Sequence, residues 1–324
     1  MHRLSVLLIL SAAFLAGTAL APRVVRAEAP ADVPAPQKAV LVTGASSGIG
    51  RKITEVLAAR GHFVYAGARK DGDLAELNRM DNVEAVRLDV TSQADIAAAV
   101  ARVTAAGRGL HGIVNNAGVA VFLPMNETPE ADIDFVFDVN VYGPYRINKA
   151  FMPLLVANQG RTTTIGSISG FISGARSGTY SMSKFAVEAY TDALAAEMAE
   201  SGVLVSVIEP GGFRSEIREK VVMHMMGKAP GETGNLTEEE QQQLERMRER
   251  NAKLKEPDEV AEAVVHALFA EKPKPRYMVA PDQEEATLTI RTALQRVAQL
   301  NADQPYSFSA EELAAMLKEA MAGQ

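Results

Sequence analysis

A tyrosine and a lysine four residues apart, Tyr180 and Lys184, are the residues of this chain best suited to acid–base chemistry. In a helix this spacing puts both side chains on one face. A phenol has a pKa of about 10, and a neighbouring ammonium lowers that pKa because it favours the phenolate. The pair alone is common and usually marks a solvated helix face, so its chemistry depends on the residues around it.

Two other polar residues have positions that would let them join this pair. Ser167 follows a strand-like run, within the segment Ile-Gly-Ser-Ile-Ser-Gly at 165–170, where a serine also suits a turn or a helix cap. Asn140 lies on a helical face that is otherwise apolar. An unpaired buried amide costs about 1–3 kcal/mol. Asn140 therefore either has a function or satisfies backbone groups at the kink before Pro144.

A glycine-rich segment, residues 43–50, reads Thr-Gly-Ala-Ser-Ser-Gly-Ile-Gly and connects the first strand-like run to the first helical pattern. Glycines let the backbone turn tightly and approach a pyrophosphate, which the free N–H groups of the helix then bind. A glycine pattern alone is weak evidence, but its position between strand and helix is the one that this mechanism requires. We therefore predict a dinucleotide site here.

The end of the second strand-like run predicts which dinucleotide binds. An enzyme that uses NAD(H) would place a carboxylate there for the ribose 2′-hydroxyl. This chain has Ala-Gly-Ala-Arg-Lys at 66–70 and no carboxylate before Asp71. The guanidinium of Arg69 suits a 2′-phosphate, although an exposed basic turn would look the same. The sequence favours NADP(H), with NAD(H) as the alternative.

Alternating strand-like and helical segments must position these residues. The strand-like runs are nearly continuous in apolar residues, which is typical of a parallel sheet covered on both faces. We predict a doubly wound α/β fold of the Rossmann type, in a single domain. Strands are expected at 39–43, 63–66, 83–88, 110–114, 162–165, 203–208 and 276–279, and helices at 49–57, 96–103, 133–140, 180–200 and 260–268.

Two regions depart from this alternation. Residues 214–256 form an insertion with a Met-rich patch and a charged helix that opens with a capping-box spacing at Thr237 and Glu240. We predict a lid in which Met223 and Met226 contact an apolar substrate, although these methionines would equally serve to dock the charged helix. Residues 282–324 are expected to form a C-terminal helical extension.

Composition limits the function classes. The chain has 324 residues, 33 Lys and Arg against 40 Asp and Glu, and no Cys. The absence of Cys excludes disulfides, thiol nucleophiles and thiolate metal sites, and the spacing of the five His argues against a zinc site, so we expect no metal. A net charge of −7 argues against a nucleic-acid partner. A small-molecule partner fits these features best.

The N-terminus resembles a targeting segment rather than part of the fold. Residues 1–27 combine a short positive start, an uncharged run over 4–22 and small-residue cleavage sites, as in a signal peptide or an uncleaved membrane anchor. Residues 28–37 are rich in Pro and Ala and suit a linker. We expect a protein that is exported or anchored in the membrane, on a side that the sequence leaves open.

Taken together, the motifs resemble those of the short-chain dehydrogenases/reductases, over about residues 38–281 and in that family's order. Within the family the likeness is loosely to the hydroxysteroid and retinol dehydrogenase type. The resemblance rests on Thr43–Gly50, Asp89, Asn115–Gly118, Asn140, Ser167, Tyr180, Lys184 and Pro210-Gly211.

The resemblance implies roles for individual residues. Tyr180 would be the catalytic acid/base, Lys184 would hold the nicotinamide ribose, Ser167 would bind the substrate oxygen and Asn140 would order a proton-relay water. Ser215 replaces the usual Thr near the carboxamide, and Ser47 stands where NADP enzymes often carry a basic residue. Implied cofactor contacts are Thr43, Gly44, Ser46, Ser47, Gly48, Ile49, Gly50, Arg69, Asp89, Val90, Asn116, Ala117, Gly118, Tyr180, Lys184, Pro210, Gly211 and Ser215.

The expected function is therefore an NADP-preferring oxidoreductase that interconverts a carbonyl and an alcohol, acting on an apolar ketone, aldehyde or secondary alcohol. Phe171, Phe213, Met223 and Met226 are the candidate substrate contacts. The resemblance also implies a homo-oligomer, and residues 4–22 suggest membrane association. The alternative is a dinucleotide-sensing or scaffold protein without turnover, which would have no need of the set Asn140, Ser167, Tyr180 and Lys184.

Overall fold

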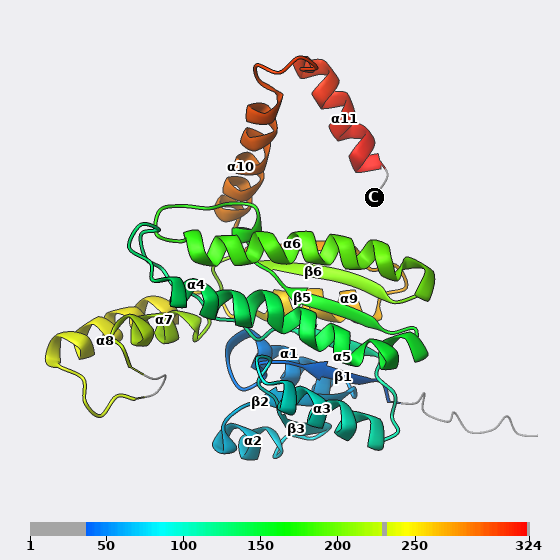
Figure 1. The fold of residues 1–324 in the computed structure, drawn as a ribbon, viewed down its shortest axis with the longest axis vertical. Helices are drawn as coiled ribbons and strands as arrows, with labels where there is room; N and C mark the ends of the chain where they lie inside the picture. Colours follow the sequence, from blue (N-terminus) through cyan, green and yellow to red (C-terminus); the bar gives the residue numbers. More distant parts are fainter. Residues whose placement is uncertain (1–36, 229–231, 323–324) are drawn as a thin grey trace, which may run out of the picture. The chain divides into compact units, whose positions relative to one another are not determined.

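Seven short, largely apolar runs form one parallel sheet (Figure 1). The structure is a computed structural model that describes residues 37–228 and 232–322. The sheet has the order β3-β2-β1-β4-β5-β6-β7, and all neighbouring strands are parallel. The strands are β1 (Ala39–Val42), β2 (Phe63–Ala68), β3 (Val83–Arg87), β4 (Gly112–Asn115), β5 (Arg161–Ile165), β6 (Leu204–Pro210) and β7 (Arg276–Val279).

Helices alternate with these strands, as predicted. The helices up to β6 are α1 (Gly48–Ala59), α2 (Asp71–Leu77), α3 (Gln93–Ala105), α4 (Glu130–Phe137), α5 (Gly143–Ala157) and α6 (Gly178–Met198). The later helices are α7 (Ile217–Met225), α8 (Glu238–Ala252), α9 (Asp258–Phe269), α10 (Gln283–Asn301) and α11 (Ala310–Ala322). Three short turns complete the list: η1 (Asp138–Tyr142, π-helical), η2 (Ile168–Gly170, 3₁₀) and η3 (Ala199–Ser201, 3₁₀).

The strand order reverses between β1 and β4. The chain first builds outward from β1 to β3, then returns to the other side of β1 and builds outward again to β7. In an open α/β sheet the crevice outside the carboxyl ends of the strands at such a switch point is the usual ligand site. The predicted doubly wound Rossmann-type fold is confirmed, and its switch point lies at the glycine-rich segment.

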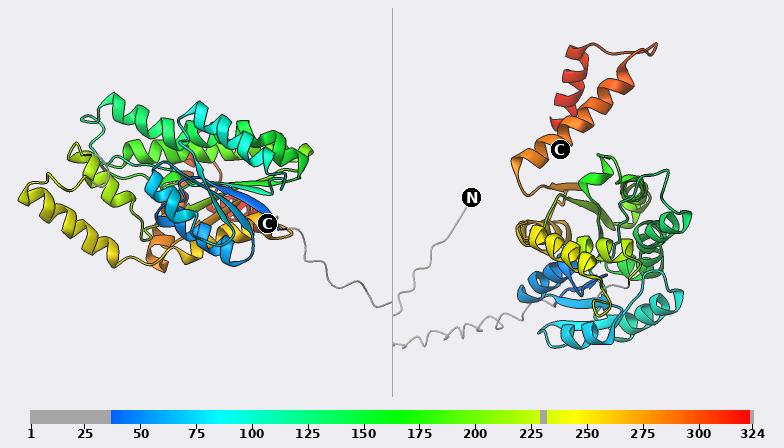
Figure 2. Two further views of the ribbon diagram at one scale, coloured as in Figure 1. Left: turned by 90° about the horizontal axis from the view of Figure 1, so that it is seen from below. Right: turned by 90° about the vertical axis from the view of Figure 1, so that its left-hand side faces the viewer.

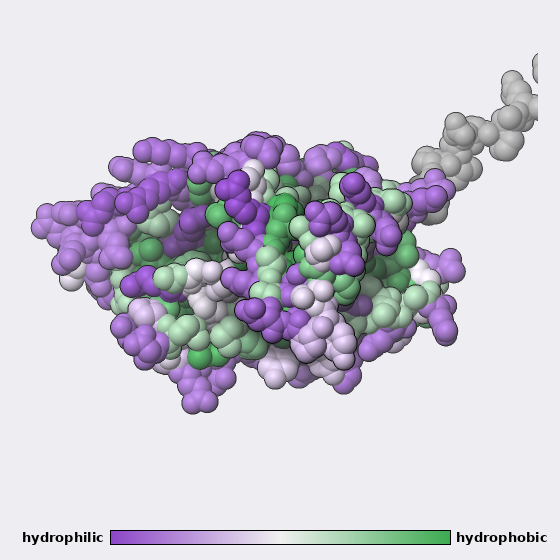
Figure 3. Space-filling model, turned by 90° about the horizontal axis from the view of Figure 1, so that it is seen from above, coloured by the Kyte–Doolittle hydropathy of each residue, from purple (hydrophilic) through white to green (hydrophobic). Residues whose placement is uncertain are grey.

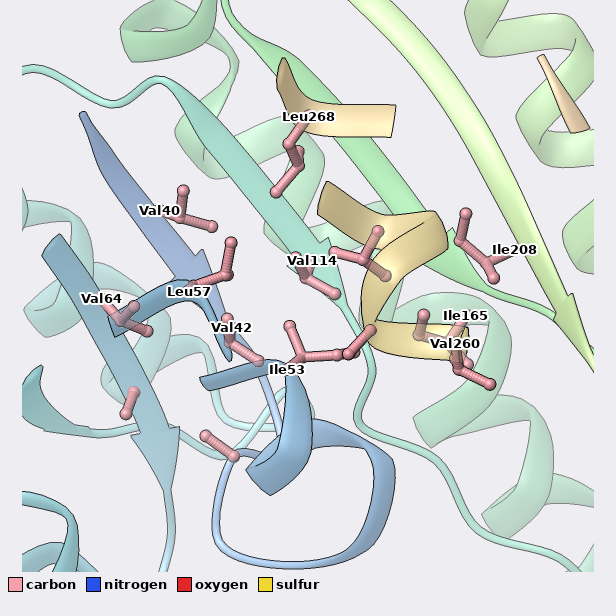
Figure 4. Close-up of a cluster of buried hydrophobic side chains, with 14 of the residues drawn as sticks. Val40, Val42, Ile53, Leu57, Val64, Val114, Ile165, Ile208, Val260 and Leu268 are labelled. Carbon is pink, nitrogen blue, oxygen red and sulfur yellow. The ribbon is translucent and has the colours of Figure 1, made fainter. Parts of the chain in front are cut away.

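Alternate residues of each strand feed a core on either face of the sheet. In β1, Val40 and Val42 pack with α1 and α9 on one face (Figure 4). Ala39 and Leu41 pack with α3 and α5 on the other. These β1 side chains are at most 1% exposed, so the strand is buried on both faces, and this explains its continuous apolar sequence. The sheet can therefore hold the loops at its carboxyl ends firmly in place.

The insertion between β6 and α9 contains α7 and α8, drawn in yellow in Figure 2. α8 begins with the predicted capping box, in which Thr237 and Glu240 bond each other's backbone N–H groups. The predicted targeting segment and nearly all of the predicted linker lie outside the described residues and stay predictions. Within 37–228 and 232–322, no helix has the length and apolar composition needed to cross a bilayer.

Candidate active site

The glycine-rich segment turns sharply from β1 into α1. Gly44 and Gly48 have φ values of +64° and +54°, a region that favours glycine. A Cβ on Gly50 would lie 2.2 Å from Asn116 Nδ2 and 2.3 Å from Gly44 O. Only glycine fits there, because the backbone of the segment packs directly against the loop that follows β4.

Thr43 and Asn116 join the ends of β1 and β4. The Thr43 hydroxyl accepts hydrogen bonds from the backbone N–H groups of Asn116 and Ala117, both at 3.0 Å. In return Asn116 Nδ2 donates to the carbonyl oxygens of Thr43 and Gly44, also at 3.0 Å. The two predicted motifs therefore form a single structural unit at the switch point of the sheet.

The N-terminus of α1 is suited to an anion. Its N-cap, Ser47, makes no side-chain cap hydrogen bond, and the first turn carries no acidic residue. The backbone N–H groups of this turn lack intrahelical partners, and the helix dipole favours negative charge. Together with the close packing at Gly50, this arrangement fits the pyrophosphate of a dinucleotide.

Arg69 and Asp89 lie together at the ends of β2 and β3. The Arg69 side chain is exposed, and its Nη1 lies 3.5 Å from Asp89 Oδ2. Burial raises the pKa of Asp89, but hydrogen bonds from Thr91 and the charge of Arg69 outweigh this and lower it. Asp89 is therefore ionised at neutral pH. Val90, which was predicted to contact the cofactor, is buried in the core with α3 and α5.

Tyr180, Lys184 and Ser167 meet beside the carboxyl end of β5. Lys184 lies four residues after Tyr180 on α6, and its Nζ is 5.5 Å from the centre of the Tyr180 ring. Ser167 precedes η2, where its Oγ accepts a hydrogen bond from Ser169 N at 3.1 Å, and it also hydrogen-bonds Tyr180. Ser167 therefore caps η2, as considered from the sequence, and in this position it also contacts the phenol of Tyr180.

Lys184 is buried and donates to the carbonyl oxygen of Ile165 at 2.8 Å. Burial lowers its pKa to about 8, against the opposing charge of Glu188. Burial raises the pKa of Tyr180, and its hydrogen bond with Ser167 and the charge of Arg218 offset part of this rise. The expectation of a lowered Tyr180 pKa is therefore wrong for this structure, because the ammonium lies over the ring and points to a backbone carbonyl.

Asn140 occupies the π-helical turn η1 between α4 and α5. Its Oδ1 accepts from Val119 N at 2.8 Å, and its Nδ2 donates to Val119 O at 2.9 Å and to Ser183 Oγ at 3.0 Å. The amide is therefore satisfied by a neighbouring loop and by α6, rather than by the kink before Pro144. Asn140 ties the loop after β4 to the helix that carries Tyr180.

The end of β6 completes the crevice. Pro210 is the last residue of this strand, and Gly211 follows it. A Cβ on Gly48 would lie 3.1 Å from Ser215 Oγ, so Ser215 faces the glycine-rich segment. The structure thus brings the predicted cofactor residues of β1, β4 and β6 to one end of the sheet.

The four predicted substrate contacts are not brought together around a cavity. Met223 is fully buried and Phe213 is only 3% exposed, so both belong to the core. Phe171 lies under the Arg276 guanidinium, and Met226 follows the end of α7. A cavity beside Tyr180 is lined instead by Val222 and Met225 of α7 and by Phe122, whose ring centre is 5.8 Å from that of Tyr180.

Sequence reasoning also missed Lys220 of α7, whose Nζ donates to Ser47 Oγ at 2.8 Å. Ser47 was identified as a position that lacks the basic residue frequent in NADP enzymes, and the structure places a cation there from another element. Residues 47 and 220 are far apart in the chain, so no local pattern connects them. The sequence hinted at this contact in one way: a lysine of the insertion closely follows Ser215, the residue expected to meet the nicotinamide carboxamide.

A family model described as short chain dehydrogenase matches residues 38–225. The "Uncharacterized oxidoreductase YbbO" of Escherichia coli is 34% identical over 248 residues, which is 75% of this chain and 86% of that protein. Retinol dehydrogenase 7 of Mus musculus is 37% identical over 184 residues, which is 56% of this chain and 58% of that one.

Two solved structures share the fold at 24% identity each. A short-chain dehydrogenase/reductase from Burkholderia phymatum in complex with NAD has a TM-score of 0.67, and the match covers 84% of this chain and 98% of that one. A short-chain dehydrogenase from Burkholderia cenocepacia in complex with NADP has a TM-score of 0.63, with 83% and 98% covered. The same fold thus accompanies either dinucleotide, and the choice between them depends on individual side chains.

Proposed function

The chain belongs to the short-chain dehydrogenase/reductase family of oxidoreductases, and from this premise we propose that it interconverts a carbonyl and an alcohol with NADP(H) in preference to NAD(H). The substrate proposed is an apolar ketone, aldehyde or secondary alcohol. The observation that carries this proposal is the meeting of Tyr180, Ser167 and Lys184 beside the carboxyl end of β5, next to the glycine-rich segment.

Several residues of the chain are proposed to contact the dinucleotide. The N-terminus of α1 would hold the pyrophosphate, Asp89 would lie by the adenine, and Lys184 would hold the nicotinamide ribose. The nicotinamide, when bound, supplies or accepts the hydride. A side chain of the protein must then exchange the proton with the substrate oxygen.

Tyr180 is suited to moving the proton at that oxygen. Because its pKa is raised, the phenol keeps its proton at neutral pH and can donate it to a carbonyl oxygen during reduction. Ser167 hydrogen-bonds Tyr180 and would donate to the same substrate oxygen. Asn140 uses both of its amide hydrogens, so only Oδ1 retains capacity to accept from a water.

Two cations support the preference for NADP(H). Arg69 is exposed at the end of β2, where a ribose 2′-phosphate would lie. Lys220 reaches Ser47 at the start of α1 and adds an ammonium beside the glycine-rich segment. Phosphate oxygens favour charged donors of this kind, whereas a 2′-hydroxyl would favour a carboxylate.

The test combines turnover with one substitution. Purified protein should consume NADPH in the presence of medium-chain aldehydes or apolar ketones. Tyr180→Phe keeps the ring but removes the transferable proton, so kcat should fall by about 100-fold or more. NADPH binding, followed by nicotinamide fluorescence, should persist in the variant.

Two results would contradict this proposal. Near-wild-type turnover in Tyr180→Phe would exclude the proposed mechanism. Tight dinucleotide binding without turnover of any carbonyl or alcohol would instead indicate a sensing or scaffold protein on the same fold.

A further inference from the structure

The helices of the insertion line an open cavity of about 460 Å³ beside the proposed active site. From α7 come Arg218, Val221, Val222 and Met225, whose spacing of i, i+3, i+4 and i+7 places them on one helical face. α8 contributes a matching face, and Phe122 comes from the loop after β4. The volume lies within the range usual for small-molecule sites, about 300–1,000 Å³.

Half of the cavity lining is apolar. The apolar side chains are Phe122, Val221, Val222, Met225, Met247 and Leu254. Met and Val side chains of this kind accommodate irregular hydrocarbon surfaces. This part of the lining agrees with the apolar substrate proposed above.

The charged part of the lining has one sign. It comprises Arg176, Arg218, Arg246 and Arg250, and no Asp or Glu of the described residues joins them. None of these four guanidinium groups has a carboxylate within 4 Å in the part of the chain that the structure describes. Arg246 and Arg250 are four residues apart on α8, where like charges repel each other.

Other arginines of the insertion are paired. Arg214 Nη1 lies 2.6 Å from Glu256 Oε1, and Arg248 Nε lies 3.0 Å from Glu219 Oε2, which connects α8 to α7. The insertion therefore neutralises its arginines outside the cavity, while Arg246 and Arg250 inside it form no ion pair with any described residue. In a chain with a net charge of −7, this concentration of positive charge is local.

One side chain, Phe122, separates the cavity from the proposed catalytic tyrosine. Phe122 belongs to its lining, and the Phe122 ring packs edge-on against Tyr180 at 5.8 Å between ring centres. Arg218, also in the lining, is near enough for its charge to influence the Tyr180 hydroxyl. A molecule that fills the cavity and extends past Phe122 would have one end at Tyr180 and the other among the arginines of α8.

We propose that the substrate carries an anionic group, a carboxylate or a phosphate, on an apolar body, and that Arg246 and Arg250 bind this anion. A guanidinium presents paired N–H donors that match both kinds of oxyanion. The apolar body packs against α7 and α8 while the carbonyl or hydroxyl group lies at Tyr180. This inference rests on the proposed function for its reactive end, but the anion site is independent of turnover.

The kinetic test compares a substrate with its uncharged ester. Reduction of 10-oxodecanoate and of methyl 10-oxodecanoate is measured with wild-type protein and with Arg246→Gln/Arg250→Gln. The variant should lose about tenfold or more in kcat/KM for the acid and should keep its value for the ester. Arg214→Gln, a paired arginine outside the cavity, should leave both substrates unchanged. Equal losses for acid and ester would overturn the proposal.

A binding test works without any reaction. Isothermal titration with decanoate and with decyl phosphate distinguishes the two possible anions, since the better ligand identifies the favoured group, and decanol serves as the uncharged control. Binding of an anion should weaken about tenfold in the double variant, because its two guanidinium ligands are lost. It should also weaken with added salt, because salt screens exposed charges. Anion binding with no carbonyl turnover would refute the proposed function alone. Anions that bind no better than decanol, or equally well to the variant, would refute this inference alone.

Discussion

Two glutamates and one arginine meet in the interior beneath the Ser167 turn. Arg276 of β7 lies 3.0 Å from Glu188 Oε2 on α6 and 2.9 Å from Glu209 Oε1 on β6. A Cβ on Gly170 would lie 2.9 Å from Glu188 Cγ, so the cluster packs directly against the segment that holds Ser167. Burial and the neighbouring Glu188 raise the pKa of Glu209 to about 9. One guanidinium does not offset two buried carboxylates, and Glu209 therefore keeps a proton at neutral pH.

This raised pKa predicts a pH-dependent stability. Folded Glu209 stays protonated up to about pH 9, whereas in the unfolded chain it ionises near the ordinary glutamate pKa of 4.5. Its stabilising contribution is therefore complete below pH 4.5 and is lost as the pH rises towards 9, by up to about 1.4 kcal/mol per pH unit. Glu209→Gln, which cannot ionise, should become more stable relative to wild type at each step from pH 5 to 8.5 in urea unfolding.

Asp192 provides the matched control for this experiment. It also pairs with Arg276, at 3.0 Å, but its side chain is 65% exposed. Asp192→Asn should therefore leave the pH dependence as it is in wild type. If Glu209→Gln showed the same pH dependence as wild type, Glu209 would have to be ionised in the folded protein.

At the scale of elements, the insertion contributes a cation to the dinucleotide site. Lys220 of α7 donates to Ser47 Oγ at 2.8 Å and lies 3.5 Å from Glu216, so it is held over the start of α1. Lys220→Met should weaken NADPH binding by about tenfold, because a charged hydrogen bond to phosphate is lost. NADH binding should change little. Fluorescence titration with both dinucleotides measures the difference.

Two further variants sharpen this prediction. Lys228→Met removes a lysine of the same insertion that bonds Asn235 O, and it should affect neither dinucleotide. Arg69→Asp replaces a phosphate ligand by an acceptor for the ribose hydroxyl, and it should raise NADH use relative to NADPH. Equal weakening of both dinucleotides by Lys220→Met would mean that Lys220 contacts the shared pyrophosphate instead of the 2′-phosphate.

Most elements could be predicted from the sequence because each carries its own periodicity. β1 and α6 lie within a few residues of their predicted bounds, and the capping box at Thr237 was recognisable from two residues. The π-helical turn was not predictable, since the apolar spacing around Asn140 fits an uninterrupted helix. Met223 was assigned to the substrate by composition, but the orientation of α7 turns it into the core.

In the candidate site too, contacts within one element could be predicted and contacts between distant elements could not. Tyr180 and Lys184 are adjacent on one helix, so their spacing alone predicted their contact. Lys220 reaches Ser47 only because α7 folds back over the glycine-rich segment, and the arginine-lined cavity exists only because α8 lies against α7. Contacts that depend on how an insertion folds leave no periodic trace in the sequence.

For the whole molecule, the C-terminal helices are the least buried part of the described chain. α11 contains no buried residue, and Thr289 is the only one in α10. Figure 3, viewed from the side of these helices, shows apolar residues between hydrophilic ones. Large apolar side chains on them are exposed, among them Leu288, Leu294, Leu300, Met316 and Met321. The start of α10 is attached through Glu285, which accepts a hydrogen bond from Gly212 N at 2.9 Å, and further along the helix Arg296 lies over the ring of Phe185 of α6, 4.7 Å from its centre.

Because α11 is exposed and Glu285 is bonded to the loop after β6, a truncation of α11 and a substitution of Glu285 should have different effects. A chain that ends at Asn301 should keep its kcat, and its melting temperature should shift by less than about 2 °C, because α11 buries nothing. Glu285→Ala should raise the KM for the dinucleotide, because the loop after β6 loses an anchor. A fall of many degrees in the truncated protein, seen by calorimetry, would show that α11 is covered in solution, for example by a second copy of the chain.

The π-helical turn η1 also takes up one residue between two helices without changing the phase of the second. A π-helical turn holds about one residue more than an α-helical turn, so the additional residue is absorbed inside the turn and the helix that follows keeps its orientation. Thus α4 directs Asp132 and Phe135 towards His224 of the insertion, while α5 directs Ile147 into the core against the sheet. Deleting a single residue from η1 would convert it into an ordinary α-helical turn, so we expect the contacts of Asn140 with Val119 and Ser183 to be lost before the packing of α5 changes. The additional residue in the turn therefore serves the position of Asn140 rather than the orientation of α5.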